Sequence, residues 1–182
     1  MQVIWYTAMS MDGRLAGPGD DLSFLQTIAP HDLTEFETFL ASVDAVLVGS
    51  TTIRWLEREG HGSLPAEDKD VWVLTHDDEL AARMARASDR VTRRQGDVGP
   101  VLDEMAAAGH ERVWICGGGD VAGQIATLDR IDEVIVTIAP TILGSGPALF
   151  EFVGPPVGGF RLQEAGSYGG GDSVRARWIR ER

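Results

Sequence analysis

Apolar positions are arranged along the chain in two different patterns. Short runs rich in β-branched and aromatic residues are typical of strands, and we predict strands at residues 3–8, 45–48, 70–75, 90–92, 113–116 and 133–139. Between them, apolar positions recur every three to four residues, which predicts helices from Pro30 and Asp32 to residue 43 and over residues 51–58, 78–87, 98–108 and from 120 onward. Residues 45–48 are apolar throughout, so this strand should be buried on both faces.

The end of the chain follows a different pattern. Two extended runs, residues 160–167 and 173–180, flank a glycine-rich turn and predict an antiparallel hairpin. The strands and helices before it predict a three-layer α/β sandwich with a mixed, mostly parallel central sheet, folded as a single domain over residues 1–182. In the last strand we expect a solvated basic face opposite the apolar residues, formed by Arg175, Arg177 and Arg180.

The charge balance narrows the possible functions. With 28 acidic and 16 basic residues the net charge is −12, which argues against general nucleic-acid binding and against attachment to an anionic membrane. No apolar stretch is long enough for a transmembrane helix and the first residues lack the features of a signal peptide, so we expect a cytoplasmic protein. The single cysteine, Cys116, fits a reducing compartment and is expected to pack as a small apolar residue.

Three consecutive glycines, Gly117–Gly119, separate a predicted strand from a predicted helix. Glycines let a ligand approach the backbone, and a helix N-terminus offers unpartnered N–H groups, so this loop is suited to bind phosphate. A turn that needs only positive φ angles is the alternative. The spacing also fits a Rossmann fingerprint, but several strands precede the loop and the acids of the next strand, 133–139, lie at its start. Asp120 suits a helix N-terminus but would repel a phosphate beside it.

Four segments, in order, resemble one known superfamily. They are residues 8–13 (Ala-Met-Ser-Met-Asp-Gly), 45–52 (Ala-Val-Leu-Val-Gly-Ser-Thr-Thr), 113–119, and 137–146 followed by Leu-Phe. Together they span nearly the whole chain. The sequence resembles the dihydrofolate reductase-like superfamily, in the branch of the C-terminal reductase domain of bacterial bifunctional riboflavin biosynthesis proteins.

The resemblance implies an NADPH-dependent oxidoreductase, often a homodimer, similar to 5-amino-6-(5-phosphoribosylamino)uracil reductase or dihydrofolate reductase. Its small-molecule substrate would be a pterin- or aminopyrimidine-like heterocycle that accepts a hydride. The resemblance implies that Gly117, Gly118 and Gly119 take the cofactor diphosphate and that Ala8 lines the nicotinamide side. Gly49 and Thr52 would approach the cofactor, and Thr75 would lie near the adenosine ribose and its 2′-phosphate.

One position departs from the family pattern. Where the family commonly has Gly-Arg-x-Thr, with the arginine on the 2′-phosphate, this chain has Ser50, and the residue after Thr75 is His76. A phosphate prefers arginine, so NADH is a second candidate cofactor. Arg54, one helical turn from Ser50, could substitute, but an ordinary surface arginine is the simpler interpretation.

Hydride transfer to a C=N or C=O group also needs a source of protons. Asp21 is the first candidate, because residues 21–25 resemble the stretch that carries the substrate-facing acid in dihydrofolate reductases. A solvated helix start is the alternative for Asp21. Asp12 is the second candidate, and its alternative is a turn residue that orders its loop.

The substrate pocket has weaker candidates. Phe24 could stack on a flat heterocycle, as could Trp5 and Trp55, and Gly144 and Gly146 could bound the pocket. The four histidines are scattered without a cysteine partner, so we expect no metal site. The competing hypothesis is a non-catalytic nucleotide-binding or regulatory module of the same fold, motivated by the missing arginine and the unassigned acid.

Overall fold

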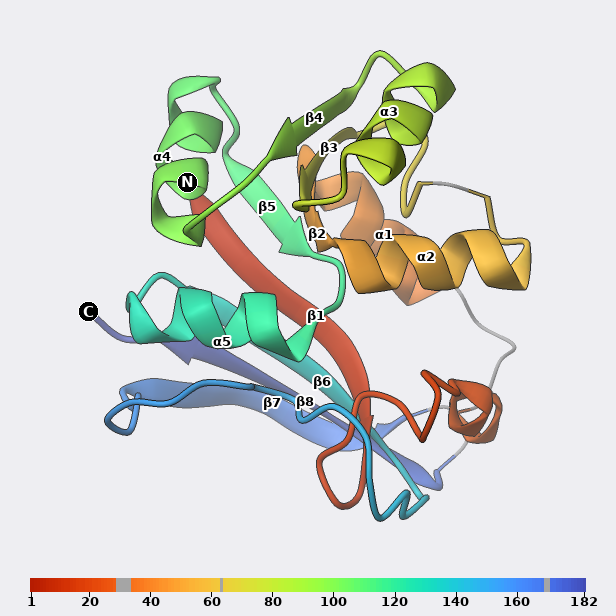
Figure 1. Cartoon of the computed structure of the whole chain (residues 1–182). Coiled ribbons are helices and arrows are strands. Elements are labelled where there is room, and N and C mark those ends of the chain that lie inside the picture. The colour runs from red at the N-terminus through yellow and green to blue at the C-terminus, as the bar shows by residue number, and fades with distance from the viewer. Residues whose placement is uncertain (29–33, 63, 169–170) are drawn as a thin grey trace.

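A computed structural model describes residues 1–28, 34–62, 64–168 and 171–182. Its central sheet has the strand order β4-β3-β2-β5-β1-β6-β8-β7 (Figure 1). The strands are β1 (Gln2–Ser10), β2 (Ala45–Gly49), β3 (Asp70–Leu74), β4 (Val91–Arg94), β5 (Arg112–Ile115), β6 (Glu133–Ala139), β7 (Phe160–Tyr168) and β8 (Ser173–Arg180). The first six are parallel, whereas β8 runs antiparallel to β6 and β7 antiparallel to β8. The predicted mixed sheet with a terminal hairpin is confirmed.

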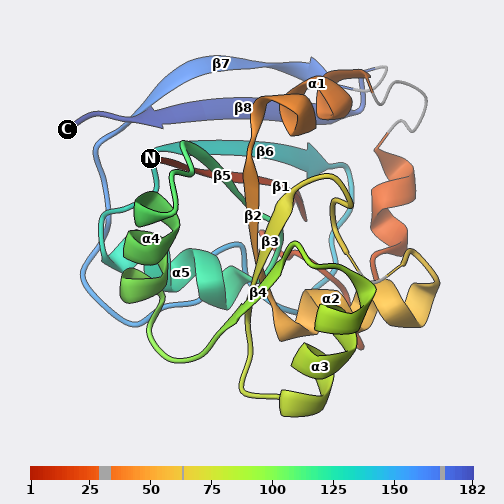
Figure 2. The same cartoon turned by 90° about the horizontal axis from the view of Figure 1, so that it is seen from above.

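Helices cover both faces of the sheet, which confirms the three-layer sandwich (Figure 2). One face carries α4 (Val98–Ala107) and α5 (Gly119–Thr127); the other carries α1 (Thr34–Ser42), α2 (Ser50–Glu59) and α3 (Asp78–Ala87). A short 3₁₀ helix, η1 (Ser23–Thr27), begins two residues after Asp21, in agreement with the helix start considered as the alternative for that residue. The predicted start of the first helix, at Pro30 and Asp32, lies outside the described residues.

Alternate residues of β1 face the two helical layers. Val3 and Trp5 are buried in the core that includes α4 and α5, whereas Ile4 and Tyr6 pack against α1. This follows from the two-residue period of a strand. As predicted, β2 is buried on both faces from Ala45 to Val48. The N-terminus of α2 follows directly from this buried strand.

β1 is longer than the sequence predicts. The predicted strand ends at residue 8, but Met9 pairs with Ile138 and Ser10 pairs with Ala139 of β6. The neighbouring strand extends the ladder, because pairing satisfies backbone groups that a loop would leave to water. Ala8 is thereby held next to Thr137 in the middle of the sheet.

The expectation of a solvated arginine face on β8 is wrong for Arg175. Its exposed fraction is 8%, whereas that of its apolar neighbour Val174 is 45%. β8 lies between β6 and β7, and α1 lies beside it (Figure 2). The Arg175 face is therefore covered, and the guanidinium must find its partners inside the protein.

Candidate active site

A cavity of about 720 Å³ opens at the carboxyl ends of the central strands. Its walls come from β1, β5, β6 and β8, from the first two turns of α2, from the glycine loop, and from the segment between β1 and α1. The size is typical of a small-molecule site. Most of the lining is apolar or aromatic, as a flat organic ligand would require.

The strand order explains why the cavity lies here. After β2 the chain goes to β3 on one side of β2, whereas after β5 it passes β1 to reach β6 on the other side. The helices that follow β2 and β5 lie on opposite faces of the sheet. Ligands of open α/β sheets bind at such a switch point, because the loops diverge and leave a crevice.

The glycine loop forms one wall of the cavity. Gly117 and Gly118 have φ angles of 87° and 95°, which side chains rarely adopt. A Cβ atom on Gly117 would lie 2.7 Å from the Thr52 hydroxyl oxygen, and one on Gly119 would lie 2.1 Å from the carbonyl oxygen of Ala148. Close packing therefore requires glycine at both positions whether or not a phosphate binds. Gly118 is different, because its Cβ would meet only an ordinary contact at 3.5 Å.

Two helix N-termini meet at this wall. Gly118 is the N-cap of α5 and Gly49 is the N-cap of α2, and neither supplies a side-chain cap. Thr52 and all three loop glycines line the cavity. Free N–H groups at the positive ends of two helices suit a diphosphate. Asp120 also lines the cavity, and its carboxylate accepts a hydrogen bond from Gln124 at 3.0 Å.

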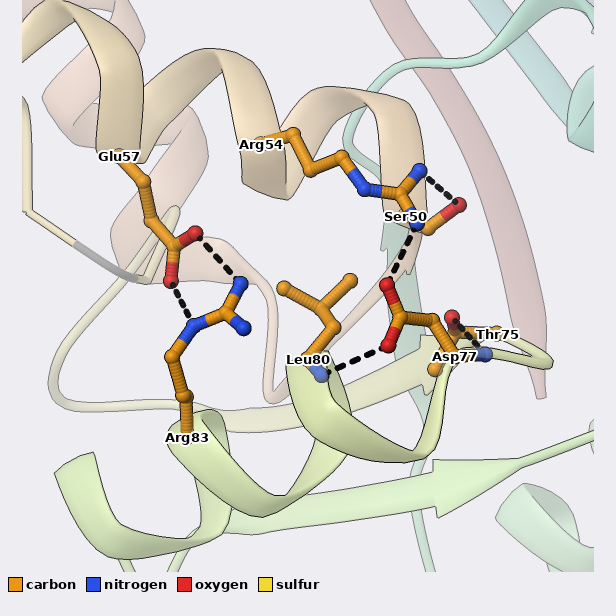
Figure 3. A network of polar contacts seen from close by, with 7 residues as sticks. All are labelled: Ser50, Arg54, Glu57, Thr75, Asp77, Leu80 and Arg83. Atoms are coloured by element: carbon orange, nitrogen blue, oxygen red, sulfur yellow. Dashed lines mark hydrogen bonds and ion pairs between the residues drawn. The ribbon is translucent and has the colours of Figure 1, made fainter.

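The residues expected near the adenosine ribose lie farther along the sheet, toward β3 (Figure 3). The Ser50 hydroxyl accepts a hydrogen bond from Arg54 at 3.3 Å. Thr75 is buried, and its hydroxyl accepts the backbone N–H of Asp77 at 3.0 Å. His76 is exposed. Ser50, Thr75 and His76 are not among the described residues that line the cavity.

Arg175 is the basic residue at the other end of the cavity. It is the only lysine, arginine or histidine among the described lining residues. Its guanidinium lies 3.6 Å from the ring centroid of Tyr168 and forms an ion pair with Glu35 of α1. It donates hydrogen bonds to the hydroxyls of Tyr6 (2.7 Å) and Thr137 (3.1 Å). Sequence reasoning missed this cluster, whose members lie far apart in the chain.

Tyr6 belongs to an aromatic floor. Its ring stacks on Phe39 at 4.4 Å, and Phe36 meets Trp114 edge-on at 5.5 Å. Burial raises the pKa of Tyr6 to about 12, and Arg175 opposes that rise. The phenol therefore keeps its proton at neutral pH while its oxygen accepts from Arg175.

The other aromatic candidates differ in whether they reach the cavity. Trp55 lines the cavity, with its ring stacked on His61 at 5.3 Å. Trp5 is fully buried in the core, with its ring centroid 6.4 Å from that of Phe150, so it cannot stack on a ligand. Phe24 is buried on η1 and is not among the described lining residues, whereas its neighbours Leu22 and Leu25 are.

Asp12 and Asp21 both accept hydrogen bonds within loops. Asp21 is exposed, accepts hydrogen bonds from the backbone and hydroxyl of Ser23, and is not among the described lining residues. Asp12 accepts the N–H groups of Leu143 and Gly144 and the Ser10 hydroxyl, and these bonds lower its pKa to about 2. Asp12 thus orders two loops near the cavity.

Gly144 and Gly146 shape the loop after β6. Gly144 has a φ of 75° and is exposed. Gly146 has a φ of 122°, and a Cβ there would lie 2.0 Å from the Ala16 carbonyl oxygen. Neither is among the described lining residues, although the next residue, Pro147, is. The two glycines bring the loop close to the cavity rim.

Cys116 lies at the end of β5 and lines the cavity. Burial raises the pKa of its thiol to about 12, so the group is protonated at neutral pH. Among residues 1–28, 34–62, 64–168 and 171–182 no group of three or more histidine, cysteine or acidic residues could hold a metal ion. No helix in the same ranges is long and apolar enough to cross a membrane.

The fold and the site together define a class: a dihydrofolate reductase-like α/β protein with a switch-point cavity. Dihydrofolate reductase from Enterococcus faecalis, complexed with NADP(H) and RAB-propyl, has this fold with a TM-score of 0.62 at 16% identity, over 100% of this chain and 97% of that one. The chain belongs to the family of the RibD C-terminal domain, whose model matches residues 57–174. The resemblance predicted from the sequence is confirmed.

Two further proteins are similar over most of their length. The uncharacterized protein YwjB of Bacillus subtilis is 26% identical over 154 residues, which is 82% of each chain. A protein of Shewanella sp. PV-4 assigned to riboflavin biosynthesis has a solved structure with a TM-score of 0.84, at 23% identity over 100% of both chains. This last likeness concerns the fold.

Proposed function

We propose that the protein is a reductase that transfers hydride from a reduced nicotinamide dinucleotide to a pterin- or aminopyrimidine-like heterocycle. The observation that carries the proposal is the joint lining of one cavity: two helix N-termini and a glycine loop at one wall, and a buried arginine within an aromatic floor at the other. The family and the reductase among its structural neighbours support the same class.

The chain has residues that fit the dinucleotide. Gly117–Gly119 and Thr52 would hold the diphosphate through backbone N–H groups and a hydroxyl. Ala8 would line the nicotinamide side, where β1 borders the cavity. Gly49, as the N-cap of α2, lets the backbone approach the ligand. The bound dinucleotide supplies the hydride, and the protein orients it.

The adenosine end would use Ser50, Thr75 and His76. Asp120 would lie beside the diphosphate, where its charge opposes binding. Its hydrogen bond with Gln124 draws that carboxylate along α5, and we propose that this lessens the repulsion. The dinucleotide is NADPH or NADH.

The substrate would lie on the aromatic floor, within reach of Arg175 and Tyr6. Arg175 would bind an oxo group of the heterocycle, because a guanidinium donates well to carbonyl oxygen. The neutral Tyr6 phenol would donate a hydrogen bond to the substrate, with its oxygen kept in place by Arg175. Its raised pKa makes it a weak acid, so it would orient the heterocycle rather than protonate it. Asp21 is kept as the proposed source of the proton, and Asp12 would have a positioning role.

The test is a titration with NADPH and NADH, followed by a search for turnover. Trp55 and Trp114 line the cavity, so binding should change protein fluorescence. Oxidation of the nucleotide is then followed by its absorbance with dihydropterins, dihydrofolate and aminouracils. Binding with turnover supports the proposal. Tight binding without turnover across the panel favours the non-catalytic module, and no binding of either nucleotide contradicts both.

We also propose the homodimer that the resemblance implies. β7 is the edge strand of the sheet, and seven of its nine residues are exposed. Exposed edges of this kind pair readily with a second chain. Light scattering on a sizing column gives the mass in solution, and a monomer at micromolar concentration contradicts this part of the proposal.

A further inference from the structure

We infer that the ion pair of Arg54 and Asp77 makes the dinucleotide site select NADH over NADPH. The inference rests on the proposed function, because it concerns the same dinucleotide. The pair joins α2 to the N-terminus of α3 (Figure 3), and neither residue is among the described residues that line the cavity. It sets which cofactor binds, and it takes no part in the chemical step.

The strand order fixes where the adenosine half must go. A diphosphate at the N-termini of α2 and α5 lies over β2 and β5, which are neighbours in the sheet. One half of the dinucleotide enters the cavity toward β1, where the substrate also has room. The other half crosses the carboxyl ends of β2 and β3, where Ser50 and residues 75–77 lie.

Asp77 is a fixed carboxylate at this place. One oxygen accepts the backbone N–H of Leu80 at 2.9 Å, as the N-cap of α3, and the other accepts Arg54 at 2.8 Å. The Leu80 N–H and then Arg54 lower the pKa of Asp77, so it stays charged at neutral pH. Figure 3 shows the carboxylate between the two helices, beside Ser50. Its side chain is 34% exposed, so a ligand can reach it.

A 2′-phosphate would meet the wrong charges here. Asp77 already occupies an N–H at the start of α3, and Asp78 and Glu79 follow it in the first turn. Two arginines of this region are already paired: Arg54 with Asp77, and Arg93 with Asp78 at 2.5 Å. A free ribose suits the same place, because its 2′-hydroxyl can donate to the carboxylate, as it does to the acid of dinucleotide-binding folds.

The test compares the dissociation constants of NADH and NADPH, read from protein fluorescence and needing no substrate. For the natural protein we expect NADH to bind about tenfold more tightly or better, as one charge-assisted contact implies. Asp77→Asn keeps the N-cap and removes the charge, so the ratio should move toward NADPH by about tenfold. Ser50→Arg, which adds a cation beside the ribose and leaves the cap intact, should move it in the same direction.

Glu57→Gln is the matched control. Glu57 and Arg83 also join α2 to α3, at 3.1 Å and with Glu57 27% exposed, but farther from the helix N-termini (Figure 3). This variant should leave the ratio unchanged. Equal binding of the two nucleotides, tighter binding of NADPH by the natural protein, or an equal shift in Glu57→Gln overturns the inference while the proposed function stands. Failure of both nucleotides to bind overturns the proposed function instead.

Discussion

The guanidinium of Arg175 donates a 2.7 Å hydrogen bond to the hydroxyl of Tyr6, and so joins the last strand of the chain to the first. The two residues are 169 positions apart. Together with Thr137 and Glu35 they form a polar cluster, with the guanidinium paired to Glu35, at one end of an otherwise largely apolar cavity.

Arg175→Met should remove substrate binding and spare the dinucleotide. The change leaves the hydroxyls of half-buried Tyr6 and buried Thr137 without their donor, which should lower the free energy of unfolding by about 1–3 kcal/mol. We expect kcat/KM for the substrate found in the panel to fall at least about tenfold, with the dissociation constant of the dinucleotide unchanged. Arg161→Met, on the exposed edge strand β7, is the control and should change neither. Unaltered kinetics in Arg175→Met would refute the role of this residue.

Alanine substitutions should separate the packing role of the glycines from their ligand role. Gly119→Ala and Gly123→Ala place a Cβ atom 2.1 and 2.2 Å from carbonyl oxygens of Ala148 and Glu151, so both should destabilise the protein by about 1–3 kcal/mol or more. Gly118→Ala meets no such clash and should cost about 1–2 kcal/mol for its positive φ. It should nevertheless weaken dinucleotide binding. Denaturant unfolding of the three variants measures stability, and fluorescence titration measures dinucleotide affinity. If Gly118→Ala bound the dinucleotide with normal affinity, the loop would be a structural turn only.

The stability of the protein should depend on Asp12 at acidic pH. Its carboxylate has a pKa of about 2 in the folded protein against 3.8 ordinarily, because Ser10, Leu143 and Gly144 donate to the charged form. Because the pKa is lower in the folded protein, the charged carboxylate stabilises the fold at pH values above its ordinary pKa. This contribution is lost as the pH falls from about 4 to about 2. The melting temperature of the natural protein should therefore exceed that of Asp12→Asn at pH 6, and the difference should shrink below pH 4. A constant difference would contradict this assignment.

Cys116 should be nearly inert in the folded protein. With a pKa of about 12, only about one thiol in ten thousand is ionised at pH 8, and the thiolate is the reactive form. A chromogenic disulfide reagent should label native protein orders of magnitude more slowly than protein unfolded in guanidinium chloride. Dinucleotide binding should slow the reaction further, because Cys116 lines the same cavity. Rapid labelling of the native protein would show that the thiol is exposed or activated.

The sequence by itself determined the elements and the class of fold. The apolar runs of β2 and the helical spacing of residues 78–87 specify local structure, because strand and helix each bury one periodic set of side chains. The alternation of these elements specified a parallel sheet, and four short segments specified the family. The glycine loop could be located because a strand end, positive φ angles and a helix start are encoded within a few residues.

Tertiary structure alone decided the substrate end of the site and the surroundings of the adenosine ribose. From the sequence Arg175 is expected at the surface, because polar and apolar residues alternate along its strand. Only the packing of α1 beside β8 buries it and places Glu35 next to it. Asp77 precedes a predicted helix, a position typical of a helix cap. Only the side-by-side placement of α2 and α3 makes it a partner of Arg54. Such contacts join residues that are distant in the chain. Their energies depend on how the helices pack on the sheet, and no local sequence pattern encodes this packing.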